Sequence, residues 1–129
     1  MTLVTSHKIL WLAVAGAMGA LCRYGLTGLI QKNLDTLFPM GTFFVNLLAC
    51  FFAGALFTIF QDKLKMPGEI RIILFIGFFG AFSTFSTFML ETTQMLRDGQ
   101  FVWAMANIIL QNTLGIIFMF CGIIIGKFI

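Results

Sequence analysis

The side chains that could do chemistry in this chain are neutral, and they gather among phenylalanines between Gly77 and Phe88. Rings recur there at every third position with small hydroxyl residues between them: Phe79, Phe82, Phe85 and Phe88, with Ser83, Thr84, Ser86 and Thr87. Hydroxyls donate hydrogen bonds, and the edge of a phenylalanine ring carries positive potential, so both groups suit a small anion. The stretch therefore predicts weak anion sites. The alternative interpretation is an aromatic core that only packs helices together.

Amide side chains add further donors on two other segments. Small and polar residues recur at every fourth position, which is one face of a helix, at Thr42, Asn46, Cys50, Gly54 and Thr58. An amide at the depth of Asn46 is costly unless it is hydrogen-bonded, so we expect Asn46 to line a polar path. Cys50 and Gly54 are expected to form a helix contact instead. Asn107 and Gln111 are also four residues apart and share a face.

Two charged residues lie within apolar segments. Arg23 either extends to the membrane interface or faces a water-filled vestibule or an acidic partner. Glu91 is the only acid within a predicted span, and it is either interfacial or a partner for Arg23 or for a buried donor. A proton or cation pathway would need more carboxylates, and a tight anion trap would need more deep cations. Weak, neutral sites are instead typical of rapid ion passage.

The residue types that enzymes use are scarce. The only histidine is His7, near the N-terminus, and the cysteines do not have the spacing of a metal site. Cys22, Cys50 and Cys121 all lie in apolar segments, where we interpret them as small hydrophobic residues. We therefore expect no enzymatic activity.

The elements that must position these residues are membrane helices. Of the 129 residues, 60% are hydrophobic and only 10% are charged, which does not suit a soluble domain of this size. The length allows about four spans of roughly 20 residues each. The pattern puts them at approximately 9–30, 41–60, 70–96 and 101–125, in one all-α membrane domain covering 1–129. Gly77 and Gly80 weaken the third helix, and nearby hydroxyls can satisfy backbone groups freed by a break.

Small residues and charge indicate how the spans pack and insert. Gly16 and Gly19 in the first span, and the pair Gly122 and Gly126 in the fourth, allow helices to approach closely in lipid. The first segment stays apolar through Leu21, so we interpret it as a span and not as a cleaved signal peptide. Both termini and the second loop share one side, and that side holds five basic residues against two on the other. This bias favours cytoplasmic termini. Four short helices do not easily enclose a polar path, so we expect an oligomer.

Three motifs resemble one known family. The stretch Gly77–Phe88 resembles the signature of the Fluc fluoride channels, also called the CrcB family. Gly41–Asn46 resembles the Gly-Thr-x-x-Val-Asn motif of that family, and Gly16–Tyr24 resembles its glycine-rich first span, which ends in Arg. The motifs occur in the family's order, and the similarity covers essentially the whole chain.

The resemblance implies an assembly and an activity. Members of that family are antiparallel, dual-topology homodimers with two fluoride pores, and their third helix is broken. They lower cytoplasmic fluoride passively and electrogenically. The resemblance therefore implies a multi-pass protein of the bacterial inner membrane whose partners are fluoride, the lipid bilayer and a second copy of itself. No nucleic acid is expected as a partner, because the basic residues are scattered near the ends of the segments.

The resemblance also implies roles for individual residues. The positions that match the family's pore are Asn46, Phe85 and Phe88, with a track of hydroxyls at Ser83, Thr84, Ser86 and Thr87. Asn107 and Gln111 occupy positions where relatives carry varied polar residues, and we assign them to the pore as well. Arg23 and Glu91 receive vestibule or structural roles. A structural Na⁺ at the dimer centre would be held by the backbone carbonyls of Gly80 and Ser83.

Two other functions remain open at this point. The first is a small multidrug-type, proton-coupled exporter, a class that also has four spans. That class relies on a carboxylate in its first span, and the first span here has no acid. The second is a non-transporting subunit of a membrane assembly, which would move no ion at all.

Overall fold

The chain folds into membrane-length helices. The computed structural model describes residues 2–32 and 34–129, with side chains from residue 7 onward. Its elements are α1 (Thr2–Lys32), α2 (Met40–Thr58), the π-helical η1 (Ile59–Lys63), α3 (Gly68–Ile72), the π-helical η2 (Ile73–Phe79), α4 (Gly80–Phe82), α5 (Phe85–Arg97) and α6 (Phe101–Phe128). Within the described residues, four stretches are long and apolar enough to cross a membrane: His7–Lys32, Met40–Lys63, Gly68–Arg97 and Phe101–Phe128. Each expected span lies within one of them, as befits an all-α membrane protein.

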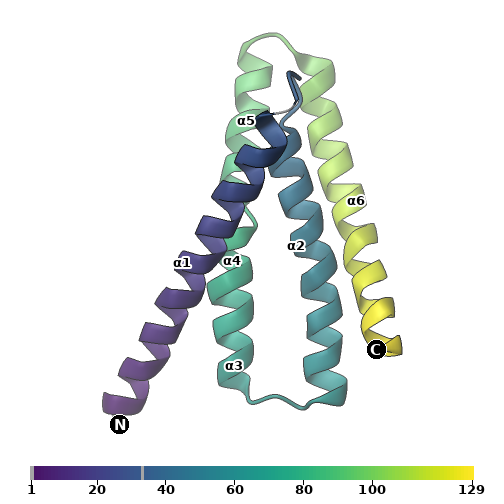
Figure 1. Ribbon diagram of the computed structural model, residues 1–129. Helices are drawn as coiled ribbons and strands as arrows, with labels where there is room; N and C mark the ends of the chain where they lie inside the picture. Colours follow the sequence, from purple (N-terminus) through teal and green to yellow (C-terminus); the bar gives the residue numbers. More distant parts are fainter. Residues whose placement is uncertain (1, 33) are drawn as a thin grey trace.

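Successive membrane-length segments run in opposite directions, so that each is antiparallel to the next (Figure 1). Both termini and the turn between η1 and α3 lie at one end, and the other two connections lie at the opposite end. The end with the termini carries five basic and two acidic residues, and the other half of the molecule carries three of each. The net charge of +3 therefore belongs entirely to the end with the termini. One of its basic residues, Lys8, forms an ion pair with Glu69 of α3.

Helices α2 and α6 pack closely because glycines face the neighbouring backbone. A Cβ added at Gly54 would overlap the main-chain oxygen of Met119, and one added at Gly122 would overlap that of Phe51. At Gly126 an added Cβ would lie 2.6 Å from the main-chain oxygen of Ala55. The predicted close contact at Gly122 and Gly126 is thus confirmed, as is the contact role of Gly54.

Helix α1 crosses the third span through a second glycine contact. A Cβ added at Gly19 would overlap the main-chain oxygen of Phe78, and one added at Gly77 would lie 2.9 Å from the Cβ of Ala15. Away from this crossing, α1 inclines outward toward its N-terminus (Figure 1). Gly77 therefore serves helix packing, in addition to any effect on helix stability.

One of two apolar core clusters among the described residues lies where α2 meets the third span. Val45 and Ala49 of α2 pack with Phe79 and Phe82, and each of these four side chains is at most 7% exposed. The rings of Phe78 and Phe82 stack with centroids 5.7 Å apart. Phe79 and Phe82 thus pack helices together, while many apolar side chains on the outer faces are exposed, as a lipid-facing surface requires.

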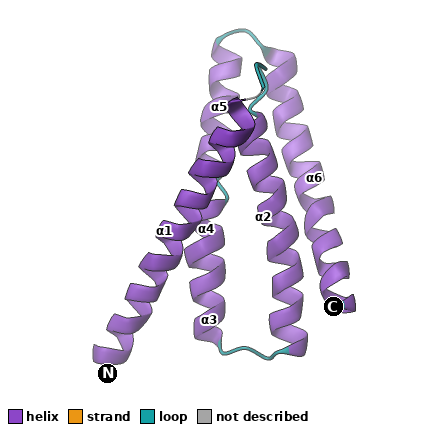
Figure 2. Cartoon of the chain, viewed as in Figure 1, coloured by secondary structure: helices purple, strands orange, loops and turns teal. Residues whose placement is uncertain are grey.

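The third span is interrupted between α4 and α5, where Figure 2 draws a short loop. Ser83 has φ −79° and ψ 159°, and Thr84 has φ −149° and ψ 112°, so both residues are extended. Helix α5 then begins at Phe85, and the side chain of Thr84 caps it by accepting a hydrogen bond from the N–H of Thr87. Ser83 and Thr84 thus lie three and four residues beyond Gly80, which itself begins α4.

Candidate functional site

The amide of Asn46 bridges α2, α6 and the interruption of the third span. Its Oδ1 accepts a hydrogen bond from the N–H of Thr84 at 2.9 Å, and its Nδ2 donates to the carbonyl of Thr84 at 3.2 Å. The same Nδ2 donates to Oε1 of Gln111 at 2.7 Å. The polar groups of Asn46 are therefore satisfied at depth, as burial of an amide requires.

These bonds redirect two backbone N–H groups that would otherwise continue the helix. In a regular helix the N–H of Thr84 would bond to the carbonyl of Gly80, and that of Thr87 to the carbonyl of Ser83. Here Thr84 donates to Asn46, and Thr87 donates to the hydroxyl of Thr84 at 3.2 Å. The carbonyls of Gly80 and Ser83 thus lose their usual partners, and carbonyl oxygens are suitable ligands for a hard cation.

The two rings expected in a pore are neighbours on the first turn of α5. The centroids of Phe85 and Phe88 are 5.8 Å apart, and their planes are inclined by 57°. Phe88 is 4% exposed, whereas Phe85 is 72% exposed. Ser86 is exposed beside Phe85, and Thr87 accepts a 2.8 Å hydrogen bond from the hydroxyl of Thr84. The pair therefore joins an interior ring to one on the outer surface of the chain.

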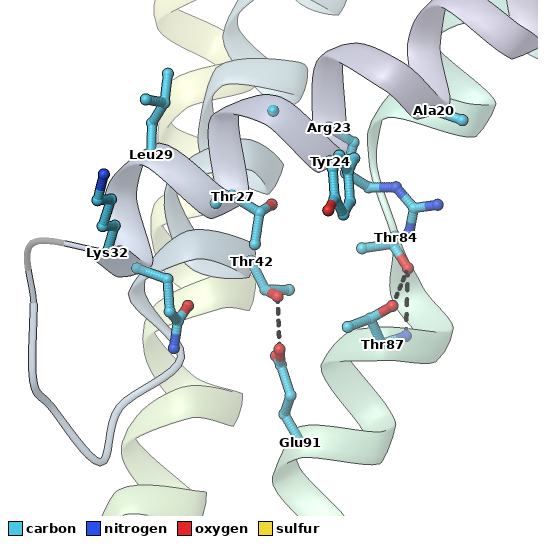
Figure 3. A pocket seen from close by; sticks show the side chains of 13 residues that line it. Ala20, Arg23, Tyr24, Thr27, Leu29, Lys32, Thr42, Thr84, Thr87 and Glu91 are labelled. Carbon is cyan, nitrogen blue, oxygen red and sulfur yellow. Dashed lines mark hydrogen bonds between the residues drawn. The ribbon is translucent and has the colours of Figure 1, made fainter.

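A cavity of about 890 Å³ opens between α1, α2 and α5 (Figure 3). Its polar lining includes Arg23, Lys32, Thr42, Thr84, Thr87 and Glu91. The hydroxyl of Thr42 donates to Oε1 of Glu91 at 2.7 Å, while Oε2 of Glu91 is buried without a hydrogen-bond partner among the described residues. Arg23 and Glu91 thus line one cavity, and the carboxylate has a buried hydroxyl as its partner.

Behind Asn46, two amides of α6 form a buried chain of hydrogen bonds. Gln111 Nε2 donates to Asn107 Oδ1 at 2.8 Å, and Asn107 Nδ2 donates to Thr92 Oγ1 at 2.9 Å. Thr92 Oγ1 donates in turn to the carbonyl of Phe88 at 2.7 Å. Sequence reasoning did not identify Thr92. The available signal was its position one helical turn after Phe88, on the same face of the helix.

Known proteins are similar to this chain over the region that contains all of these residues. Residues 10–123 match the family model described as "CrcB-like protein, Camphor Resistance (CrcB)". The chain belongs to the CrcB family. A relative from Desulforapulum autotrophicum is 42% identical over 95% of this chain and 98% of its own length. One from Nitrosococcus oceani is 45% identical over the same shares, and one from Aquifex aeolicus is 38% identical over 89% of this chain and 93% of its own length.

All three CrcB relatives carry the name "Fluoride-specific ion channel FluC", so they are named as channels and not as enzymes. The family resemblance inferred from the three motifs is thereby confirmed. The matched region contains the Asn46 bridge, the interruption, both rings and the polar lining of the cavity.

Proposed function

We propose that this CrcB protein is a fluoride-selective channel through which fluoride leaves the cytoplasm passively and electrogenically. The observation that carries the proposal is the similarity, over 95% of the chain, to relatives named as fluoride-specific channels. The geometry supports it, because an interrupted membrane helix brings an amide, hydroxyls and two phenylalanine rings together.

The proposed path begins at the cavity and follows the third span. Arg23 and Glu91 line this cavity, and so do Thr84 and Thr87, which begin the hydroxyl track along the third span. The remaining groups of the path are Asn46, Ser83 and Ser86 and the ring edges of Phe85 and Phe88, while Asn107 and Gln111 contribute to it through the hydrogen bonds that link them to Asn46. Apart from Arg23 and Glu91 these groups are neutral, so each holds an anion weakly and lets it pass to the next.

A second copy of the chain completes this path in the proposal. Phe85 is 72% exposed and Ser86 is exposed, so neither could enclose an ion in a lone chain surrounded by lipid. We take the assembly to be an antiparallel, dual-topology homodimer with two pores. The charge bias between the two ends is modest, with five basic residues against three, and is compatible with insertion in both orientations.

A structural Na⁺ at the dimer centre fits the backbone at the interruption. Gly80 and Ser83 would hold it through the carbonyls that lose their helical partners, and two copies would supply twice that number of oxygens. When bound, the ion would supply positive charge that holds the two interruptions together. Hydroxyl capping by Thr84 keeps the carbonyl of Ser83 available for this role.

The test is fluoride efflux from liposomes that contain the purified protein and potassium fluoride. Valinomycin releases potassium, so the expected result is rapid fluoride efflux that depends on valinomycin, with no efflux from matched chloride-loaded liposomes. Efflux should fall in Phe85→Ala and Phe88→Ala, and should be unchanged in Phe120→Ala, whose ring is 59% exposed on α6. The absence of valinomycin-dependent fluoride efflux would refute the proposal. Drug export that is lost in Glu91→Gln would favour the exporter instead.

The proposed location is the bacterial inner membrane. The four membrane-length helical stretches support a multi-pass protein, since helices satisfy all their backbone groups within lipid. Fractionation of cells that express the chain, with the protein in the inner-membrane fraction, is the expected result.

A further inference from the structure

The hydrogen bonds behind Asn46 form a chain that starts and ends on the third span. From the backbone N–H of Thr84 it passes through Asn46, Gln111, Asn107 and Thr92, and it ends at the backbone carbonyl of Phe88. We infer that Gln111, Asn107 and Thr92 are positioning residues, which hold the amide of Asn46 and the first turn of α5 in the conducting arrangement. The link to conduction rests on the proposed function.

The direction of every bond in the chain is fixed by its two ends. A backbone N–H can only donate, so Asn46 must turn its oxygen to Thr84 and its nitrogen to Gln111. At the far end a backbone carbonyl can only accept, so the hydroxyl of Thr92 donates to Phe88 and accepts from Asn107. The amides between them therefore have a single consistent orientation, in which each nitrogen donates to the next oxygen.

Burial separates these residues from the cavity. Asn107 is 0% exposed, Thr92 is 4% exposed and Gln111 is 8% exposed. None of the three lines the cavity that Thr84 shares with Arg23 and Glu91. They are thus placed to act through Asn46 and the Phe88 backbone, and not by touching an ion in that cavity.

Loss of one hydrogen bond should make the orientation of all the side chains in this hydrogen-bond chain less well defined. Without the hydroxyl of Thr92, the Nδ2 of Asn107 loses its acceptor in a buried site, which is unfavourable. Rotation of the Asn107 amide would relieve this, but its nitrogen would then face the nitrogen of Gln111. That conflict passes to Gln111 and weakens the hydrogen bond that its Oε1 accepts from the Nδ2 of Asn46.

The experiment compares three substitutions on α5. Thr92→Val removes the hydroxyl that links Asn107 to the carbonyl of Phe88 in the hydrogen-bond chain, and Thr92→Ser keeps that hydroxyl. Thr93→Val is the matched control, because the hydroxyl of Thr93 donates to the carbonyl of Met89 at 2.8 Å on the exposed face. Fluoride efflux from liposomes should fall about tenfold in Thr92→Val, the factor that corresponds to loss of one buried hydrogen bond. Thr92→Ser and Thr93→Val should retain wild-type efflux.

A double substitution separates positioning from direct binding of the ion. If the residues act through one chain, Thr92→Val combined with Gln111→Met should lower efflux no further than the more severe single change. Multiplied effects would mean independent ion ligands and would overturn the inference. Equal efflux in Thr92→Val and Thr93→Val would overturn it as well.

A readout without fluoride keeps this inference distinct from the proposed function. Side-chain amide protons of Asn46, followed by NMR in micelles, should exchange slowly with solvent in the wild type and in Thr93→Val, and faster in Thr92→Val. That result would support the positioning role of the hydrogen-bond chain even if the wild-type protein moved no fluoride. Unchanged exchange at Asn46 in a folded Thr92→Val protein would refute it.

Discussion

Replacement of Asn46 by leucine removes the contacts between α2, α6 and the interruption while nearly preserving side-chain shape. Three hydrogen bonds are lost, two with the backbone of Thr84 and one with Gln111. At about 1 kcal/mol net for each bond, the free energy of unfolding should fall by about 3 kcal/mol. That corresponds to a drop of roughly a hundredfold in the ratio of folded to unfolded protein.

The assay is unfolding in micelles with increasing sodium dodecyl sulfate, followed by the fluorescence of Trp11 and Trp103. The matched control is Asn112→Leu, because Asn112 donates only to the carbonyl of Ile108 on the exposed side of α6. Its free energy of unfolding should stay within about 0.5 kcal/mol of the wild type. If the two variants unfold alike, the bridge does not stabilise the fold and the reasoning is refuted.

Three further substitutions test packing and surface charge. Gly122→Ala should separate α2 from α6 and lower stability in the same assay, while Gly25→Ala, where an added Cβ meets nothing within 4 Å, should not. Phe88→Ala should cost about 3–5 kcal/mol of unfolding free energy because its ring is 4% exposed, and Phe120→Ala should cost far less; similar losses would contradict the burial. Lys8→Ala breaks an ion pair with both side chains about half exposed, so the unfolding free energy should change by about 0–1 kcal/mol.

Features that depend on local spacing could be predicted from the sequence. The membrane segments follow from composition, because apolar residues dominate whole stretches of helix length. The contact at Gly122 and Gly126 follows from a four-residue spacing of the smallest side chain. The need of Asn46 for hydrogen bonds follows from the cost of burying an amide.

Features that depend on partners from other segments could not be predicted. Phe85 and Phe88 look equivalent in the sequence, yet one is exposed and the other is buried, because only the packing of α5 decides which side of the helix faces inward. The position of Thr92 one turn after Phe88 does not by itself indicate its role, which depends on meeting Asn107 of α6. The π-helical form of η1 and η2 likewise does not follow from the spacing of their residues.

The inclination of α1 is related to the thickness of the bilayer that the protein spans. The stretch His7–Lys32 has 26 residues and a length of about 39 Å, longer than the roughly 30 Å hydrocarbon core of a membrane. Such a helix fits by tilting, and its tilt changes with lipid chain length. Because α1 touches the third span closely at Gly19, a change of tilt turns it about that contact and moves Arg23 relative to α2 and α5. We therefore predict that the width of the cavity changes with lipid chain length.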